Sequence, residues 1–184
     1  IITGTTKVLL TGTKFLLNNL FISLFLVIIL ISIFMAWMFS SFKMVLISLI
    51  PNIIPLLITG AIMGFFGIAL KPSTILVFSI AFGISVDDTI HFLAKYRQEL
   101  ISNKGVIRTS VFAALKETGV SMLYTSIVLF FGFFIFIASD FGGTVALGLL
   151  VSITLLIAML SNLLLLPALL LTYEKKLMGS FVKQ

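Results

Sequence analysis

The stretch GISVDDTIHF, residues 83–92, places two adjacent carboxylates and an imidazole inside an otherwise apolar segment. An Asp at the centre of a spanning helix costs on the order of 2.5 to 3.5 kcal/mol on insertion scales, so two of them need a compensating role. Asp87 and His91 share a helix face, whereas Asp88 points about 100° away from Asp87. Gly83, one turn before Asp87, leaves room on that face for another helix to approach closely.

No Lys or Arg lies inside the long apolar runs to neutralise these carboxylates. Burial and mutual repulsion both disfavour the doubly ionised pair, so at least one carboxyl is expected to be protonated. A carboxyl in this state can take up and release a proton, which predicts a proton relay at Asp87 and Asp88. Two alternatives stay open: both acids only hydrogen-bond neighbouring helices, or Asp88 lies at the water boundary and Asp87 alone matters. His91 is either a relay partner or a boundary residue.

A hydroxyl cluster supplies further candidate partners for the acids, namely Tyr124, Thr125 and Ser126 in the segment YTS. The other polar companions, all in the last apolar run, are Ser152, Thr154, Ser161 and Asn162. Most single hydroxyls in membrane helices hydrogen-bond their own backbone, and this alternative stays open for each of them. Only the YTS cluster is predicted to act with the acids.

The composition indicates that membrane helices position these side chains. Of the 184 residues, 60% are hydrophobic and only 10% are charged, and the mean hydropathy is +1.30, unlike a soluble globular domain. The net charge is +6, but the basic residues are scattered at the ends of apolar runs, which argues against nucleic-acid binding. The chain has no Cys and one His, which excludes disulfides and thiolate metal sites and argues against a His-based metal centre. We therefore expect an all-α membrane protein with no cofactor.

Five apolar runs are long enough to span a membrane, which takes about 20 residues across about 30 Å of hydrocarbon. The expected spans, within a domain at residues 20–175, are about 20–39, 45–69, 73–95, 118–139 and 142–172. The second span contains Pro51 and Pro55, which predict a kink near Pro55. The third is long enough only if Asp87, Asp88 and His91 lie within it or near its inner end.

The distribution of basic residues predicts the orientation of the spans. The loops after the first, third and fifth spans hold nine of them, which are Lys43, Lys95, Arg97, Lys104, Arg108, Lys116, Lys175, Lys176 and Lys183. The opposite loops hold only Lys71. This asymmetry places the two Asp residues in the inner half of the bilayer and the tail, residues 176–184, in the cytoplasm.

Two segments outside the spans carry further expectations. Residues 1–19, with their Thr and Gly, are predicted to end an external segment. Because residue 1 is Ile, the chain is expected to be a fragment of a longer protein. Residues 104–117 predict either a short amphipathic helix on the inner leaflet or an ordinary cytoplasmic connector, and both interpretations stay open.

Several motifs together resemble the resistance-nodulation-division (RND) superfamily, specifically its branch of MMPL-type, hopanoid-exporter-like and Patched-like proteins. GISVDD is similar to the GxxxDD or GxxxDY motif of that family's fourth and tenth transmembrane helices, and TIHFLAKYRQEL to the helix extension that follows. PNIIP resembles the Pro-broken helix before the motif, YTSIVLFFGFFIFIASDF the helix after it, and LLLLPALL the end of the last helix. The resemblance covers nearly the whole chain, from about Ile2.

The resemblance implies a five-transmembrane-helix bundle of the RND half-transporter type, with the core of a sterol-sensing domain. It implies that this chain corresponds to the last five helices of one transporter half, and the short basic tail favours the C-terminal half. In proton-driven members the motif acids carry the proton relay, which assigns this role to Asp87 and places Asp88 where the family has Asp or Tyr. The implied partners are the other transporter half and an external domain of the parent chain, and a homo-oligomer stays open.

We therefore expect the membrane core of a proton-motive-force-driven exporter of lipidic or amphipathic substrates, located in the cell membrane, by resemblance the bacterial inner membrane. The chain contains no nucleophile–base constellation and no phosphate loop, so it is not expected to be an enzyme. Two other functions stay open. One is a sterol- or lipid-sensing membrane domain that does not transport, and the other is a purely structural membrane scaffold.

Overall fold

The computed structural model describes residues 4–172, apart from the side chains of residues 5–9, and the described chain is all-helical. Its long helices are α1 (Thr5–Phe39), α2 (Phe42–Phe65), α3 (Pro72–Ser102), α4 (Ile107–Phe134) and α5 (Gly142–Leu160). A 3₁₀ turn, η1 (Ile135–Ala138), extends α4, and a π-helical turn, η2 (Ser161–Leu165), joins α5 to α6 (Leu166–Thr172). Five stretches of this part of the chain are long and apolar enough to cross a membrane. The predicted five-helix, all-α membrane fold is thus confirmed.

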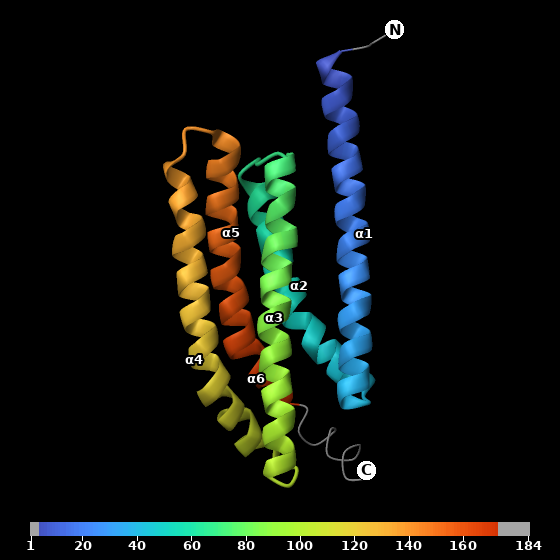
Figure 1. Cartoon of the computed structure of the whole chain (residues 1–184), viewed down its shortest axis with the longest axis vertical. Helices are drawn as coiled ribbons and strands as arrows, with labels where there is room; N and C mark the ends of the chain where they lie inside the picture. The colour runs from blue at the N-terminus through green and yellow to red at the C-terminus, as the bar shows by residue number, and fades with distance from the viewer. Residues whose placement is uncertain (1–3, 173–184) are drawn as a thin grey trace.

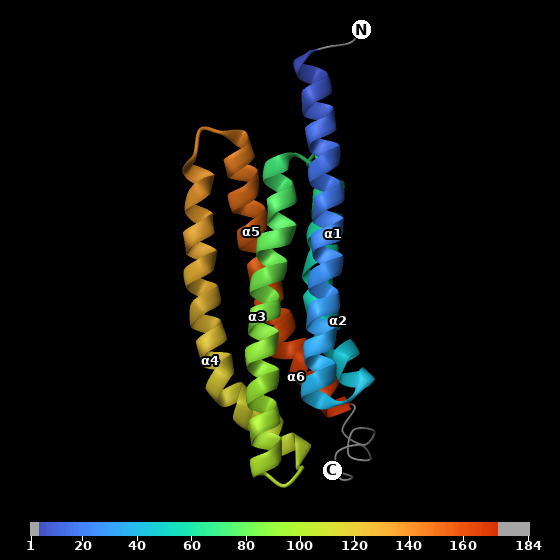
Figure 2. The same cartoon turned by 45° about the vertical axis from the view of Figure 1, so that its right-hand side comes forward.

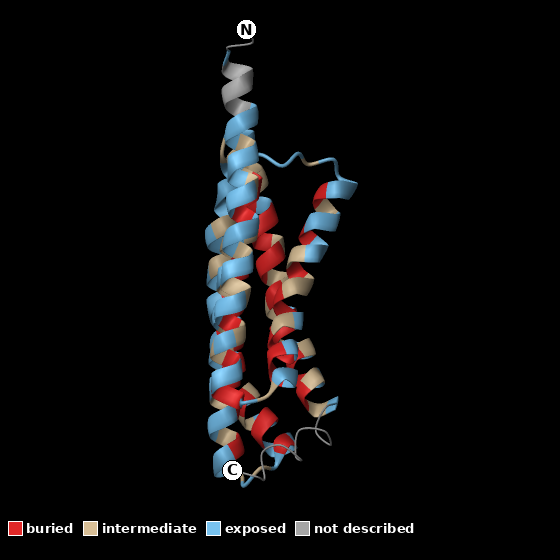
Figure 3. Ribbon diagram, turned by 90° about the vertical axis from the view of Figure 1, so that its right-hand side faces the viewer, coloured by how far each residue is buried: buried red, intermediate tan, exposed pale blue. Residues whose placement is uncertain are grey.

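The helices form an elongated bundle with α2, α3 and α5 at its centre (Figure 1). On one side α4 packs against α3 and α5, and on the other side α1 packs against α2 and α3. Figures 1 and 2 both show the N-terminal part of α1 extending beyond the rest of the bundle. Buried positions lie on the inward faces of the helices, and the outward faces are largely exposed (Figure 3). Such apolar outward faces are what a lipid bilayer would cover.

Tight connections reverse the chain between neighbouring helices. Ser40 ends α1 in the left-handed conformation, with φ of 49°. Between α3 and α4, Lys104 and Gly105 have φ of 52° and 85°, a region that glycine enters without steric cost. The turn at Lys104 and Gly105 keeps α3 and α4 antiparallel and adjacent, with a cleft between them.

The two prolines of α2 lie inside a continuous helix. Figure 1 shows α2 changing direction along its length, so that its first half leans toward the end of α1. Pro55 has no N–H to donate to the carbonyl oxygen of Pro51, one turn earlier. The hydroxyl of Ser161 donates to this oxygen instead, at 2.9 Å. The carbonyl oxygen that Pro55 leaves without a helical donor therefore receives a hydrogen bond from η2.

The helix boundaries differ from the expected spans at two places. α1 begins at Thr5, whereas the first span was expected from about residue 20. Residues 5–19 contain no proline that would stop the helix before the span. Residues 107–117 are the first turns of α4 and not a separate connector helix. Two of its apolar side chains, Ile107 and Val111, are buried in the protein core instead of facing a membrane surface. The predicted tail, residues 176–184, lies outside the described residues.

Candidate functional site

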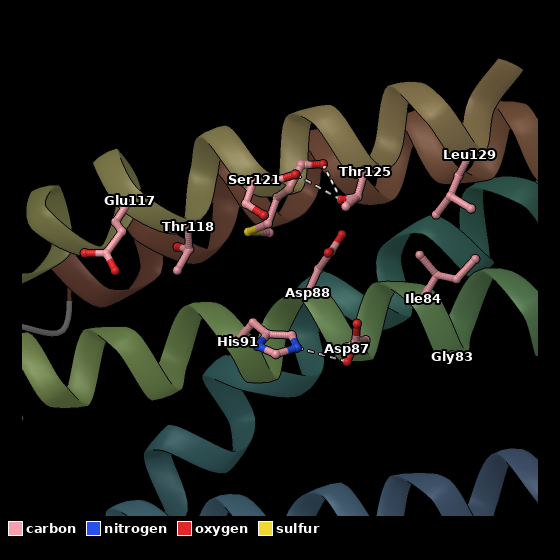
Figure 4. A pocket seen from close by; sticks show the side chains of 11 residues that line it. Gly83, Ile84, Asp87, Asp88, His91, Glu117, Thr118, Ser121, Thr125 and Leu129 are labelled. Carbon is pink, nitrogen blue, oxygen red and sulfur yellow. Dashed lines mark hydrogen bonds and ion pairs between the residues drawn. The ribbon is translucent and has the colours of Figure 1, made fainter.

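A cleft of about 630 Å³ lies between α3 and α4 and contains most of the candidate residues that the sequence indicated (Figure 4). From α3 it is lined by Gly83, Ile84, Asp87, Asp88 and His91, and from α4 by Glu117, Thr118, Ser121, Met122, Thr125 and Leu129. The spacing of three and four residues puts each set on one face of its helix. Two antiparallel helices thus present a wall with two carboxylates and an imidazole to a wall with hydroxyls and a third carboxylate.

Asp87 and His91 form an exposed pair on α3. Their side chains are both 71% exposed, and His91 Nε2 lies 3.4 Å from Asp87 Oδ1 (Figure 4). Asp88 is half-buried, and its carboxylate points across the cleft toward Ser121 and Thr125. The acid pair, meaning Asp87 and Asp88, is therefore held by one helix with its two carboxylates directed differently.

The expectation that the acid pair is buried is wrong for the described chain. No acidic side chain among residues 4–172 is buried, and Asp87 is on the surface. The reason is that α3 buries the opposite face, on which Ser85 and Thr89 hydrogen-bond to neighbouring helices. In a helix, a residue two positions from Ser85 points about 200° away from it, which directs Asp87 outward.

The predicted partners of the acids do not all reach the cleft. Thr125 lines it, and its hydroxyl bonds its own helix through the carbonyl oxygens of Ser121 (3.1 Å) and Met122 (3.0 Å). Tyr124 is exposed and Ser126 is buried, and neither lines the cleft. The structure thus brings one member of the YTS cluster to the acids, in the backbone-bonded state that single hydroxyls usually adopt.

Gly83 lies at one end of the cleft and is exposed. A Cβ atom at this position would meet no atom within 4 Å. The space beside Gly83 that the sequence predicted is therefore present, and no other helix of the described chain fills it.

Three charged residues that sequence reasoning did not assign to the site lie beside the predicted ones. Glu117 lines the cleft, and its Oε2 is 2.6 Å from Lys95 Nζ on α3. Lys95 Nζ also lies 3.1 Å from Glu99 Oε1. Asp87, His91, Lys95 and Glu99 follow one another in steps of four residues, a stripe on α3 that the sequence could have revealed.

A second polar cluster lies on the buried face of α3, next to the acids. Ser85 Oγ donates to Asn52 Oδ1 at 2.7 Å, and Thr89 Oγ1 approaches Asn162 Oδ1 at 2.9 Å. Asn162 Nδ2 donates to the carbonyl oxygen of Ser85 at 3.0 Å. All four side chains are fully or almost fully buried, and they join α2, α3 and η2. This cluster fixes which face of α3 turns toward the cleft.

The cleft brings together side chains that can take part in acid–base chemistry. Carboxylates and an imidazole that lie in hydrogen-bonding reach of one another can accept and release protons. Among residues 4–172, no group of three or more His, Asp or Glu side chains is arranged to hold a metal ion.

A protein family and one relative are similar to this chain in sequence. A sequence model described as the MMPL family matches residues 2–181. Membrane protein MJ1562 of Methanocaldococcus jannaschii is 29% identical to the chain over 131 residues, which make up 71% of this chain and 33% of that relative. The chain thus spans about a third of the length of this curated relative. No solved structure matches the chain significantly.

Proposed function

The chain belongs to the MMPL family of membrane transporters, and from this premise we propose that it is the membrane core of a proton-driven exporter of lipidic or amphipathic substrates. The family is one of transporters and not of enzymes. The observation that carries the proposal is the cleft between α3 and α4, where the acid pair and His91 face Thr125 and Glu117. Exposure of the carboxylates to the cleft, rather than burial in the helix core, supports proton exchange here.

Proton binding would change the charge of a helix that faces hydrocarbon. An ionised Asp inside the bilayer costs on the order of 2.5 to 3.5 kcal/mol, whereas protonation removes most of this cost. Each charge that crosses the membrane potential supplies about 2.3 kcal/mol per 100 mV. Together, these two energies would favour one arrangement of α3 relative to its neighbours when Asp87 is protonated and another when Asp87 is ionised.

The exposed face of α3 also suggests a partner. Asp87 and Gly83 are open in the described chain, and an ionised carboxylate cannot remain in contact with lipid at low cost. A second transporter half, packed on this face, would cover the acids and leave Gly83 as the point of close approach. An external domain of the parent chain would complete the protein. This assembly is part of the proposal.

The orientation and location belong to the same proposal. The chain is a multi-pass membrane protein. The excess of Lys and Arg in the loops on one side favours a cytoplasmic C-terminus. We propose a location in the cell membrane, by resemblance the bacterial inner membrane.

The proposal is tested with the full-length protein in liposomes that contain a fluorescently labelled phospholipid. Transport between leaflets is measured by quenching of the outer label, with and without an imposed pH gradient. Wild-type protein is expected to transport the label faster with the gradient, and Asp87→Asn is expected to lose this acceleration. Asp140→Asn is the matched control, because Asp140 is exposed between η1 and α5 and does not line the cleft. Gradient-driven transport that survives in Asp87→Asn would contradict the proposal.

One observation favours the second candidate, a lipid-sensing domain without transport. An almost entirely apolar groove of about 450 Å³ lies between α1 and α3, lined by Leu30, Ile31, Ile33, Phe34, Trp37 and Ile90. A groove of this kind, which faces the bilayer, can bind a sterol or an acyl chain. The sensing function predicts lipid binding that is the same in Asp87→Asn and in wild type, with no effect of a pH gradient on lipid movement.

A further inference from the structure

The end of the cleft nearest the α3–α4 turn carries an ion-pair network that the proposed relay does not use. Lys95 Nζ lies 2.6 Å from Glu117 Oε2 on α4 and 3.1 Å from Glu99 Oε1 on α3. The Lys95 side chain is only 16% exposed, whereas that of Glu117 is 66% exposed. The ammonium group therefore joins α3 to α4 and leaves the Glu117 carboxylate accessible.

The two carboxylates that bind Lys95 differ in their relation to the cleft. Glu117 lines the cleft on the α4 wall, with His91 on the opposite wall (Figure 4). Glu99 does not line it and instead lies near Asn103, whose Nδ2 is 3.4 Å from Glu99 Oε2. Of these two acids, only Glu117 can exchange a proton with the interior of the cleft.

The titratable groups also form a line from the turn to the acid pair. Asp87, His91 and Lys95 follow one another along α3 at four-residue intervals, and His91 already pairs with Asp87. Glu117 joins this line at Lys95. The turn that follows carries Lys104, on the side predicted to be cytoplasmic. The line therefore runs from the predicted cytoplasmic water to the predicted proton acceptor.

We infer that Glu117 is the residue that transfers protons between cytoplasmic water and the acid pair, an inference that rests on the proposed function. A hydronium ion gives a proton to the Glu117 carboxylate and becomes water. The carboxylic acid then loses its O–H proton, through water in the cleft, to the imidazole of His91, which becomes an imidazolium. The imidazolium gives a proton to the Asp87 carboxylate and returns to the neutral form. A cleft of about 630 Å³ has room for bridging water, which occupies about 30 Å³ per molecule.

The charges around Glu117 suit this role. Lys95 and Glu99 face it from α3, His91 and the acid pair lie along the same α3 wall, and its neighbour Lys116 is exposed on α4. The ammonium of Lys95, 2.6 Å from Oε2, holds the Glu117 carboxylate in place at this end of the cleft. Glu117 thus acts as a relay group and not as the site where the proton is held.

The test follows protonation of the acid pair in time. The full-length protein in lipid nanodiscs is subjected to a rapid drop in pH, and the carboxyl C=O bands are recorded by time-resolved infrared spectroscopy. The band of the acid pair is identified by its loss in Asp87→Asn and in Asp88→Asn. We expect Glu117→Gln to slow the appearance of this band by on the order of 10²-fold, the lower end for a positioned proton-transfer group, with an unchanged titration midpoint.

Three further variants separate proton transfer from a structural role of the ion pair. Glu99→Gln removes the other carboxylate of Lys95 and is expected to keep the wild-type rate. Lys95→Gln breaks the same α3–α4 ion pair but keeps the Glu117 carboxyl, so its protonation is expected to stay fast. Glu117→Asp retains a carboxyl group and is expected to restore most of the rate.

The outcomes distinguish the two proposals. A wild-type rate in Glu117→Gln overturns the inference, and equal slowing in Glu117→Gln and Lys95→Gln overturns it in favour of a structural clamp. Both of these results leave the proposed function intact. If no carboxyl band disappears in Asp87→Asn or Asp88→Asn, the acid pair does not titrate, and the proposed function itself fails.

Discussion

Replacement of Thr89 by Val tests the buried cluster that orients α3. The Thr89 hydroxyl lies 2.9 Å from Asn162 Oδ1, 3.1 Å from Asn52 Oδ1 and 3.0 Å from the carbonyl oxygen of Ser85. The side chain is completely buried. Val has nearly the same shape but no donor, so the variant removes these hydrogen bonds while it creates almost no cavity.

The expected magnitude follows from what each acceptor loses. Asn52 Oδ1 keeps the hydroxyl of Ser85 as a donor, at 2.7 Å. Among the described residues, Asn162 Oδ1 has no side-chain donor other than Thr89. An unsatisfied buried acceptor costs about 1–3 kcal/mol in water-soluble proteins, but interhelical hydrogen bonds in membranes average only about 0.6 kcal/mol. We therefore expect Thr89→Val to lower the free energy of unfolding by about 1 kcal/mol.

The measurement is reversible unfolding of the full-length protein in mixed micelles, with increasing fractions of sodium dodecyl sulfate. Thr172→Val is the matched control, because Thr172 is exposed and its hydroxyl bonds its own helix at the Ala168 carbonyl oxygen. A double-mutant cycle of Thr89→Val with Asn162→Leu isolates the pair, and we expect a coupling of about 0.5–1 kcal/mol. The reasoning is refuted if Thr89→Val costs no more than Thr172→Val, or if the two core substitutions are additive.

Two other predictions concern helix packing and orientation. Gly148→Ala is expected to destabilise the bundle by about 1–3 kcal/mol, since its Cβ would lie 2.7 Å from the carbonyl oxygen of Phe133. In the same unfolding assay, Gly132→Ala is expected to raise the free energy of unfolding by about 0.5–1 kcal/mol, because its Cβ would meet no atom within 4 Å. Because the chain has no Cys, single Asn103→Cys and Lys71→Cys variants of a cysteine-free full-length protein report orientation. An impermeant thiol reagent added outside intact cells should label only the Lys71→Cys variant, and the reverse pattern would show that the loops are inverted.

The helices could be predicted from the sequence because they depend on local properties. A run of apolar residues long enough to cross the bilayer indicates a span wherever its partners lie, and all five were found. The start of α1 at Thr5 was not predicted, because the Thr- and Gly-containing segment before residue 20 is less hydrophobic than the span that follows, and hydropathy does not distinguish helix from loop outside a span. The amphipathic pattern of residues 104–117 was also ambiguous, since apolar side chains face a protein core and a membrane surface equally well.

The candidate residues on α3 could be predicted from the sequence, whereas the charged residue that faces them from α4 could not. Asp87, Asp88, His91 and Gly83 lie together because helical periodicity relates residues within one segment. Glu117 was missed, since its place beside Lys95 depends on how α4 packs against α3. Burial depends on the same long-range packing, so the exposure of the acid pair could not be predicted from one segment.

The cause of that exposure lies in how α3 divides its polar residues between two faces. Ser85 and Thr89 point inward and find partners on α2 and η2, so this face is satisfied within the described chain. Asp87 points outward and contacts His91 of its own helix. Rotation of α3 to bury Asp87 would expose the inward hydroxyls and break their hydrogen bonds, and it would place an ionised group in the core. The outward orientation of Asp87 is therefore the stable arrangement of this bundle.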